Sequence, residues 1–536
     1  MRNVVLIIAT VVAVVVDGFF ALVNFYPVAP PRDRGPERVV LTSLNEKQAK
    51  WVQENMLDEY NAEHATNFKI RSVPDEGLLR ALRQDDVALA VLPEIEADQA
   101  ANENHVVPFD GVVSRARIAE DFANVRPEIL ESARYRDQQF FLPRAVALDV
   151  AVYRISKVRD ALLHWQLVRP EIESALRAVN GRGLPAQYVL EQQPADWDAY
   201  DLFVLAYYWA HRGYSGQHAK PRVAHRVGLS TEAQLEIAAA MYRAGMSDRT
   251  LAAHDSKPAL DWFQWETLYR EQNLYAQEMF EPAGIDDQAI LDGITRGDFY
   301  LTSVDQMQAF SLHGGSYRGA LALVPDGDDL AFTAMPRFAS LELDETGIPV
   351  RRADPFSFRE TLVWALPAQS PVQQEAYNLI RWIVERENHA RECEALGILP
   401  MRRDVIRERE TLFREPWMQD ALEAGLDQWS RAQVPPSTLQ GALGVDYAVA
   451  WHRIVAQREV APSARAGFGP LLTAQIDRAA AVHAAEQLVA AHHREPIAEE
   501  DAEAAFAMPA LREPMVIEGL SRDAGVDSGI TAEVVR

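Results

Sequence analysis

The sequence is poor in cysteine and in positive charge. Cys393 is the only cysteine among 536 residues, which excludes an internal disulfide, a cysteine-based zinc site and a Cys-x-x-Cys redox pair. Lysine and arginine number 53 against 78 aspartate and glutamate residues, so the formal net charge is −25. Such a balance disfavours a nucleic-acid surface, because that surface needs basic side chains to neutralise phosphates. We therefore expect no nucleic-acid partner.

Motifs of common enzyme classes are also missing. Residues 313–319 begin His-Gly-Gly, as esterase oxyanion loops do, but Arg318 stands where a Gly-x-Ser-x-Gly nucleophile elbow needs its second glycine. His211, His218 and His225 lack the spacing of a metal-binding helix, and surface positions explain them better. The sequence thus predicts no enzymatic activity, no catalytic residue, no cofactor and no metal ion.

An apolar run near the start of the chain predicts membrane targeting. Residues 4–26 are mostly apolar, with Asp17, Gly18 and Asn24 among the exceptions, and about 20 apolar residues suffice for a helix to cross a bilayer. We expect an uncleaved anchor, with a cleaved signal peptide as the alternative. Asp17 weighs against the anchor, since a carboxylate near the bilayer centre costs roughly 2.5–3.5 kcal/mol. The proline-rich residues 28–37 predict a semi-rigid spacer.

The next stretch predicts three parallel strands with crossover helices. Residues 39–42 form an apolar strand, and Ser43 and Glu46 have the spacing of a capping box that begins a helix. Residues 68–73 alternate like a strand at a sheet margin, and 87–92 form the apolar run typical of a strand covered on both faces. Because crossovers are right-handed, the carboxyl ends of these strands share one edge, where open α/β sheets bind ligands.

Polar side chains at this edge are the first candidates for binding a solute. Ser43, Asn45 and Glu46 follow the first strand, and Glu94 follows the third. Helix capping explains Ser43 and Glu46 at least as well as ligand binding does.

Aromatic residues further along the chain suggest either a core or a binding surface. Trp262, Trp265 and Tyr269 fall on one face of a helix that begins near Asp261. One interpretation is a packing stripe. The other is a platform on which the apolar face of a sugar ring stacks, while carboxylates and amides bind its hydroxyls. Residues 198–211, apolar nearly all round, predict a buried helix.

Several motifs occur in an order that is shared with a known family. Residues 137–143 read Asp-x-x-aromatic-x-Leu-Pro and lead into a strand over 146–153; a helix, a glycine turn and a strand follow within 288–303. After a helix, residues 397–404 read Gly-Ile-Leu-Pro-x-Arg-x-Asp, in which the glycine and the proline suit a helix end. Over roughly residues 39–457 this order resembles the family 1 extracellular solute-binding proteins.

The resemblance implies an α/β fold of the periplasmic-binding-protein type II, with two lobes joined by a hinge. Members of the family are ligand-capturing subunits of ATP-binding cassette (ABC) importers, and many bind sugars. The implied partners are a small polar solute, a mono- or oligosaccharide, and ABC permease subunits. The implied location is periplasmic or extracytoplasmic, on the inner (cytoplasmic) membrane through the anchor. A core of this size makes disulfides unnecessary there.

The resemblance also adds ligand-binding candidates. In the family a ligand-facing loop follows the strand that here ends near residue 303, which points to Ser303 and Asp305. Arg144 follows the Leu-Pro turn and could bind a solute through its guanidinium. The full predicted set is Ser43, Asn45, Glu46, Glu94, Arg144, Trp262, Trp265, Ser303 and Asp305.

These features divide the chain into seven predicted segments. They are a transmembrane anchor or signal (1–27), a spacer (28–37), the first part of lobe 1 (38–150), a mostly helical lobe 2 (151–300), the remaining strands and helices of both lobes (301–457), a C-terminal helical extension (458–495) and an acidic, partly disordered tail (496–536). Two other functions remain open: an anchored sensor or scaffold whose tail binds a partner, and a secreted hydrolase with Ser316 as its nucleophile.

Overall fold

The computed structural model describes most of residues 35–476. Within that range it leaves out residues 45, 74, 136–137, 213–218, 229–230, 247–255, 282–283, 286, 314–328, 355–358 and 410–441. The predicted anchor, most of the spacer and the acidic tail therefore lie outside the described residues. Within the described part, no helix combines the length and the apolar character needed to span a membrane.

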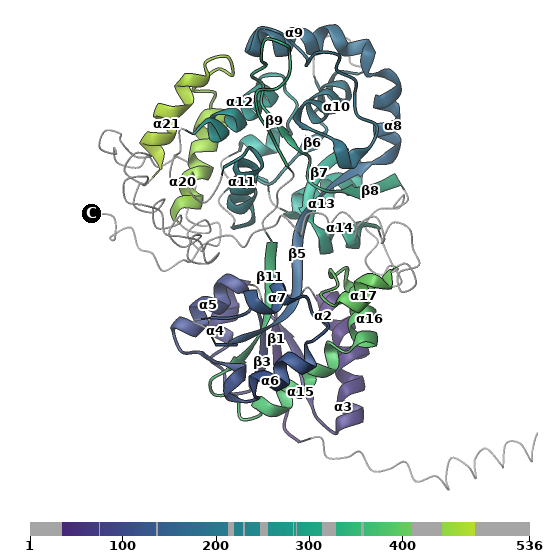
Figure 1. The fold of residues 1–536 in the computed structure, drawn as a ribbon, viewed down its shortest axis with the longest axis vertical. Helices are drawn as coiled ribbons and strands as arrows, with labels where there is room; N and C mark the ends of the chain where they lie inside the picture. Colours follow the sequence, from purple (N-terminus) through teal and green to yellow (C-terminus); the bar gives the residue numbers. More distant parts are fainter. Residues whose placement is uncertain are drawn as a thin grey trace, which may run out of the picture.

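Two lobes share one mixed sheet, whose strand order is β2-β1-β3-β11-β5-β7-β6 (Figure 1). The short strands β4 and β8 pair with β11 and β5, and β9 pairs with β10. The strands are β1 Arg38–Thr42, β2 Phe68–Ser72, β3 Val87–Pro93, β4 Val106–Val107, β5 Phe141–Arg154, β6 Val223–Ala224, β7 Leu301–Asp305, β8 Leu330–Thr333, β9 Phe338–Ala339, β10 Arg352–Ala353 and β11 Arg359–Pro367.

Lobe 1 contains the predicted parallel strands. β1 pairs in parallel with β2 and β3, and β2 lies at the sheet edge, as its alternating pattern indicated. Ala49, Val52, Met56 and Tyr60 are buried, which confirms the amphipathic crossover helix. The helices of lobe 1 are α2 Glu46–Val52, α3 Asp58–His64, α4 Asp75–Ala81, α5 Glu94–Asn102, α6 Arg115–Asp121, α7 Pro127–Ser132, α15 Gln373–Ile383, α16 Arg386–Leu396 and α17 Arg403–Arg407, with a π-helical turn, Gln53–Leu57, between α2 and α3.

β5 joins the two lobes. Its first part pairs antiparallel with β11 in lobe 1 as far as Leu148, and from Asp149 onward it pairs with β7 in lobe 2. One continuous strand thus changes its neighbour at Asp149. In Figure 1 β5 and β11 are the strands that pass between the upper and the lower lobe. The predicted hinge between the lobes stays a prediction.

Lobe 2 is mostly helical. α10 begins with a capping box between Asp198 and Asp201 and is buried on nearly every side, so the predicted buried helix is confirmed. The C-terminal helices α20 and α21 pack on α11 and α12 (Figure 1). The helices are α8 Ile155–His164, α9 Arg169–Asn180, α10 Ala199–His211, α11 Thr231–Arg243, α12 Lys257–Glu271, α13 Asp287–Arg296, α14 Gln306–His313, α20 Ala442–Trp451 and α21 Phe468–Gln475.

Three local expectations differ from the structure. α2 begins at Glu46, later than a helix capped by Ser43 would. The helix predicted over 373–387 is broken between α15 and α16, because the backbone of Glu385 is extended. Residues 303–305 belong to β7 and not to a loop. By contrast, Gly397 ends α16 with φ 71° as expected of a helix-ending glycine.

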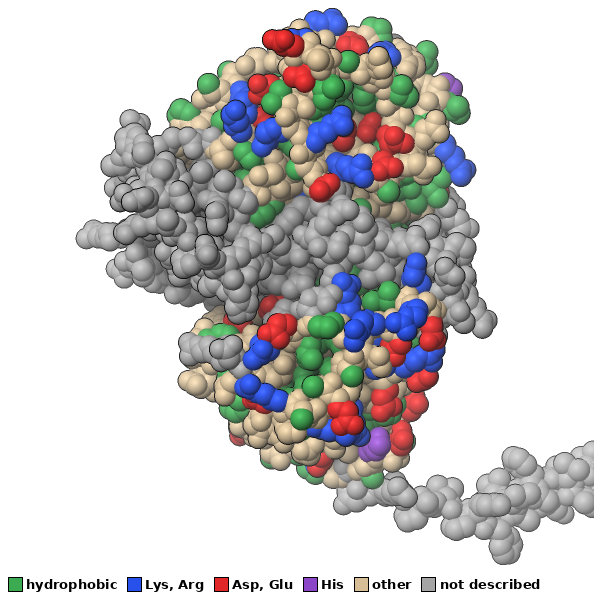
Figure 2. Space-filling model, in the orientation of Figure 1, with side chains coloured by type: hydrophobic (Ala, Val, Ile, Leu, Met, Phe, Trp, Pro, Cys, Tyr) green, Lys and Arg blue, Asp and Glu red, His purple; other side chains and the backbone are tan. Residues whose placement is uncertain are grey.

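Charged side chains are spread over the surface of both lobes. Figure 2 shows basic and acidic side chains interspersed on the visible described face, without a continuous basic patch. This distribution agrees with the low count of basic residues in the sequence.

Candidate functional site

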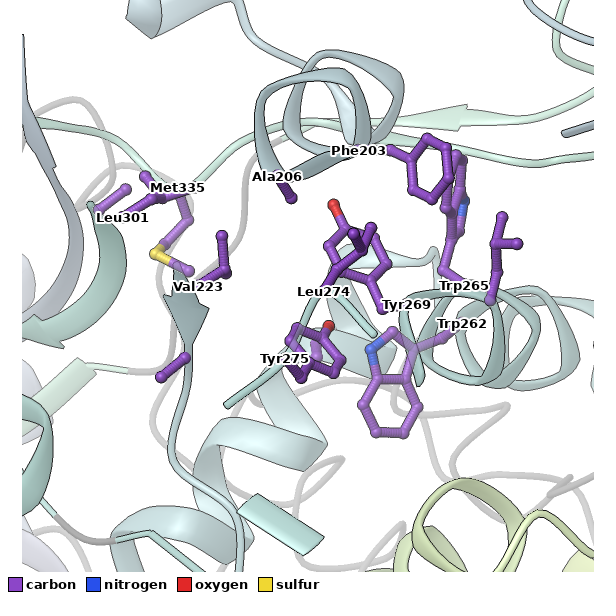
Figure 3. Close-up of a cluster of buried hydrophobic side chains, with 14 of the residues drawn as sticks. Phe203, Ala206, Val223, Trp262, Trp265, Tyr269, Leu274, Tyr275, Leu301 and Met335 are labelled. Carbon is purple, nitrogen blue, oxygen red and sulfur yellow. The ribbon is translucent and has the colours of Figure 1, made fainter. Parts of the chain in front are cut away.

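A pocket lies inside lobe 2 between the sheet and the helices α10, α11 and α12. Its volume, counted as space open to the centre of a water molecule, is about 160 Å³. Val223 and Leu301 from β6 and β7 lie on one side, while Trp262, Tyr269 and Tyr275 lie on the other (Figure 3). Every described residue that lines the pocket falls in the range 151–338, so the pocket belongs to lobe 2 alone.

α12 supplies the aromatic wall. Trp262, Trp265 and Tyr269 all line the pocket, so they share one helix face as their spacing predicts. The indole N–H of Trp265 donates to the carbonyl oxygen of Ala339 at 2.8 Å, and the ring of Tyr269 stacks on Tyr275 with centroids 4.8 Å apart. These contacts fix the wall. The rings are buried, as the packing interpretation expects, and they also line a pocket, while the platform for a sugar ring stays a prediction.

Glu266 is the best-connected carboxylate of the pocket. It accepts hydrogen bonds from the Tyr275 hydroxyl at 2.8 Å and from the Trp451 indole N–H at 2.9 Å. His225, which follows β6, lies 3.2 Å from the same carboxylate. Burial alone would lower the pKa of His225, but the charge and the hydrogen bond of Glu266, together with the charge of Glu236, outweigh burial and raise that pKa. The arrangement therefore favours an ion pair between His225 and Glu266.

A second carboxylate, Glu236 on α11, is held by two guanidinium groups. Arg243 lies 2.9 Å from it and Arg226 lies 3.1 Å from it. Burial opposes its ionisation, but the two positive charges outweigh burial and hold the pKa of Glu236 below its usual range. Arg226 also forms an ion pair with Asp149 on β5. This chain of charges links the pocket to the point where β5 passes between the lobes.

Ser303 on β7 contributes a hydroxyl group that has no hydrogen-bond partner in the described part of the chain. Its side chain is buried and lines the pocket, opposite Ala151 of β5 in the sheet. Its Oγ has no hydrogen-bond partner among the described residues. A buried polar atom without a partner costs roughly 1–3 kcal/mol, so a bound hydroxyl group would relieve a cost that the empty pocket carries.

Comparison with known proteins shows the fold. No family model matches the sequence, and no curated protein matches it. Maltose-bound MalE3 of T. maritima aligns with a TM-score of 0.58 at 12% identity, covering 82% of this chain and 99% of that one. An ABC transporter solute-binding protein from Thermotoga lettingae, bound with alpha-D-tagatose, aligns with a TM-score of 0.56 at 13% identity, covering 82% and 100%. The chain has the two-lobed α/β fold of these solute-binding proteins.

A third structure extends this comparison. The cyclic alpha-maltosyl-1,6-maltose binding protein of Arthrobacter globiformis aligns with a TM-score of 0.55 at 13% identity, covering 82% of this chain and 99% of that one. The expected periplasmic-binding-protein-like fold is therefore confirmed. Identity this low establishes the architecture, and the solute remains a separate question.

The structure brings three of the predicted site residues together. Trp262, Trp265 and Ser303 line the same pocket, although they lie on α12 and β7. Asp305 instead caps α14, where it accepts hydrogen bonds from the backbone N–H groups of Met307 at 2.8 Å and Gln308 at 3.2 Å.

The candidates from the first strands lie in lobe 1. Ser43 precedes α2, Glu46 is the first residue of α2 and Glu94 is the first residue of α5, so all three follow strand ends as predicted. None of them lines the lobe 2 pocket. Asn45 lies outside the described residues.

Arg144 lies in the core of lobe 1, a position that the sequence did not indicate. It is buried in lobe 1, where its guanidinium forms a two-bond ion pair with Glu392 of α16, one bond being 2.8 Å long. The same group lies over the ring of Trp364, 5.0 Å from the centroid. Because its donors already bind a carboxylate in the core, we leave Arg144 out of the proposed site.

Sequence reasoning missed the polar side of the pocket. Glu266 lies four residues after Trp262 and three before Tyr269, so it shares the aromatic face of α12, and this spacing was a usable signal. Its partners His225 and Trp451 lie 41 and 185 residues away, and no local pattern indicates them. The prediction of a surface position for His225 was wrong, because the pair with Glu266 holds it inward. Among the described residues, no group of side chains could hold a metal ion.

Proposed function

We propose that this protein is an extracytoplasmic solute-binding protein that captures a small polar solute, a sugar or oligosaccharide, for an ABC-type importer. The observation that carries the proposal is a pocket with an aromatic wall, a satisfied carboxylate and an unsatisfied hydroxyl, set in a fold of two lobes. The neighbouring structures are described as binding proteins, several of them for maltose or related sugars, which supports binding over catalysis.

The chemistry of the pocket suits a sugar. A pyranose has an apolar C–H face, which packs on an aromatic ring such as Trp262, and a rim of hydroxyl groups. Glu266 can accept hydrogen bonds from such hydroxyls, and Ser303 can donate one. A few placed polar groups within a mostly apolar pocket are the usual composition of small-molecule sites.

Binding would be coupled to closure of the lobes. Asp149 lies where β5 changes its sheet partner, and it is paired with Arg226, which reaches Glu236 in the pocket wall. A solute that contacts this wall can favour one lobe arrangement only through its differential affinity for it. In the proposed role, closure presents a changed surface to the permease. Residues 1–27 would hold the protein on the outer face of the cytoplasmic membrane.

A thermal-shift screen of the purified full chain tests the proposal. The library contains sugars, polyols, amino acids and short peptides. A ligand that binds only the folded state stabilises it by about 2.7 kcal/mol at a hundredfold excess over Kd, which a melting curve resolves. A shift with sugars alone supports the proposal. A shift confined to amino acids or peptides, or no shift at all, contradicts it.

A further inference from the structure

The size of the pocket limits the solute. The 160 Å³ counts only the space open to the centre of a water molecule. Each water needs roughly 10–15 Å³ of such space, so the pocket holds about ten waters. A single sugar ring has about a dozen non-hydrogen atoms, which matches that capacity, whereas a chain of several rings exceeds it. The pocket does not extend past its aromatic wall, because Trp265 is hydrogen-bonded to the carbonyl oxygen of Ala339 and packs against Phe203 with ring centroids 5.7 Å apart.

The charges of the pocket are already balanced. The charged side chains that line it are His225, Glu236, Arg243, Glu266 and Arg337. Glu266 is paired with His225, Glu236 with Arg243, and Arg337 with Asp196 at 3.0 Å. A charged solute would therefore find no unpaired opposite charge among the described lining residues, most of which are buried. Burying an unpaired charge is costly, so a neutral solute is favoured.

The unsatisfied group of the pocket also points to hydroxyl chemistry. The Oγ of Ser303 is buried without a partner in the described part of the chain, and it can both donate and accept. Glu266, already bonded to two donors and paired with His225, can only accept. A hydroxyl group of the solute suits both residues. It can donate a hydrogen bond to the Glu266 carboxylate, and it can donate to or accept from the Ser303 hydroxyl.

We infer that the lobe 2 pocket binds a neutral solute of single-ring size, a monosaccharide or a cyclic polyol, in preference to linear oligosaccharides and to charged sugars. This inference rests on the proposed function and narrows its solute class. It also assigns recognition to lobe 2, since the described lining residues all come from that lobe.

Isothermal titration of the full chain tests the inference with four sets of probes. The first set is neutral and single-ring: glucose, galactose, mannose, xylose and myo-inositol. The others are the amino sugars, the uronates and the linear trisaccharide of whichever hexose binds best, with maltotriose included in every case. We expect at least one neutral single-ring probe to show saturable binding with a stoichiometry of one probe molecule per protein chain. Its charged and trimeric counterparts should bind at least tenfold more weakly.

The outcomes separate the inference from the proposed function. If a trisaccharide or a charged sugar binds as well as the neutral ring or better, the protein is still a sugar-binding protein and the inference is wrong. If no probe gives saturable heat, the proposed sugar-binding function itself fails. Replacing Trp262 by alanine in the same titration serves as the control for binding at this pocket. Its affinity should fall at least tenfold.

Discussion

The indole N–H of Trp451 donates a 2.9 Å hydrogen bond to Glu266, which lies 185 residues earlier in the chain. Trp451 ends α20, and its ring stacks on Phe280 with centroids 6.1 Å apart. α20 thus supports Glu266 in a pocket whose described lining includes residues of β5, β6, β7, β9, α10, α11 and α12. In this protein the C-terminal part of the described chain is a structural component of the candidate site.

Replacing Trp451 by phenylalanine should remove that N–H while keeping a ring against Phe280. Glu266 then loses one of its two neutral donors, and hydrogen bonds to charged groups contribute roughly 1.5–3 kcal/mol. We expect the free energy of unfolding in urea to fall by about 2 kcal/mol beyond the cost of the smaller ring. Solute affinity should fall as well.

Trp364 provides the matched control for this substitution. Its ring is buried, but its Nε1 has no hydrogen-bond partner in the described structure. Trp364→Phe therefore loses ring volume without losing a hydrogen bond. If both substitutions destabilise the protein equally and leave solute affinity unchanged, the bond between Trp451 and Glu266 has no role in holding the pocket.

Ser303→Ala should separate binding from stability. The Oγ of Ser303 is unpartnered, so its removal should leave the free energy of unfolding unchanged or slightly raised. Loss of one hydrogen bond to the solute should weaken binding about tenfold, or about 1.4 kcal/mol. Titration calorimetry and urea unfolding measure the two effects.

Ser340→Ala is the control for that experiment. Ser340 is buried outside the pocket, and its hydroxyl donates to the carbonyl of Glu342 and accepts from the N–H of Arg351, each at 3.1 Å. This substitution should lower stability and spare affinity. The opposite pattern in the two variants would show that the Ser303 hydroxyl does not face the solute.

Arg144→Met should act on stability and not on binding. It leaves Glu392 as a buried carboxylate without its partner, and breaking a buried ion pair from one side costs roughly 3–5 kcal/mol. The double variant Arg144→Met, Glu392→Leu should recover most of that loss, because both charges are gone. A solute-affinity loss at unchanged stability would restore Arg144 to the ligand-binding set.

His389 should make the protein sensitive to acid. Burial, with Arg144 and Arg402 nearby, lowers the pKa of His389 to about 3. In the unfolded chain the pKa of His389 is about 6.5, so below that pH the imidazole binds a proton in the unfolded state but not in the folded state. Stability is therefore fully present above about pH 6.5 and falls as the pH drops toward 3.

The acid effect is measurable by urea unfolding at pH 7 and pH 5. The contribution of His389 to the free energy of unfolding should be about 2 kcal/mol smaller at pH 5 than at pH 7. His389→Gln keeps an acceptor for the backbone N–H of Met401, which the ring nitrogen binds at 3.0 Å, but it cannot titrate. An equally steep pH dependence in this variant would contradict the assignment.

Several strands and helices could be predicted from local patterns because their signals are local, whereas the two-lobed arrangement was implied by the family resemblance. The apolar run of β3, the alternation of β2 and the helix-ending Gly397 each depend on neighbouring residues, and each was placed correctly. The continuity of β5 through both lobes was less visible. Its partners lie in β7 and β11, and only their pairing shows where one lobe ends.

The site was harder to predict because it depends on distant pairs. Trp262, Trp265 and Ser303 were named from spacing and resemblance, and they line one pocket. Arg144 was also named, but its guanidinium pairs with Glu392, 248 residues away, and nothing near Arg144 in the sequence indicates that buried carboxylate.

The central claim is that the lobe 2 pocket holds the solute, and one titration tests it most directly. The full chain and its Trp262→Ala variant are titrated with neutral hexoses, and circular dichroism verifies that both are folded. The account predicts saturable binding at one solute per chain, weakened at least tenfold in the variant. Unchanged affinity in the folded variant, or no saturable binding to the unaltered chain, would contradict it.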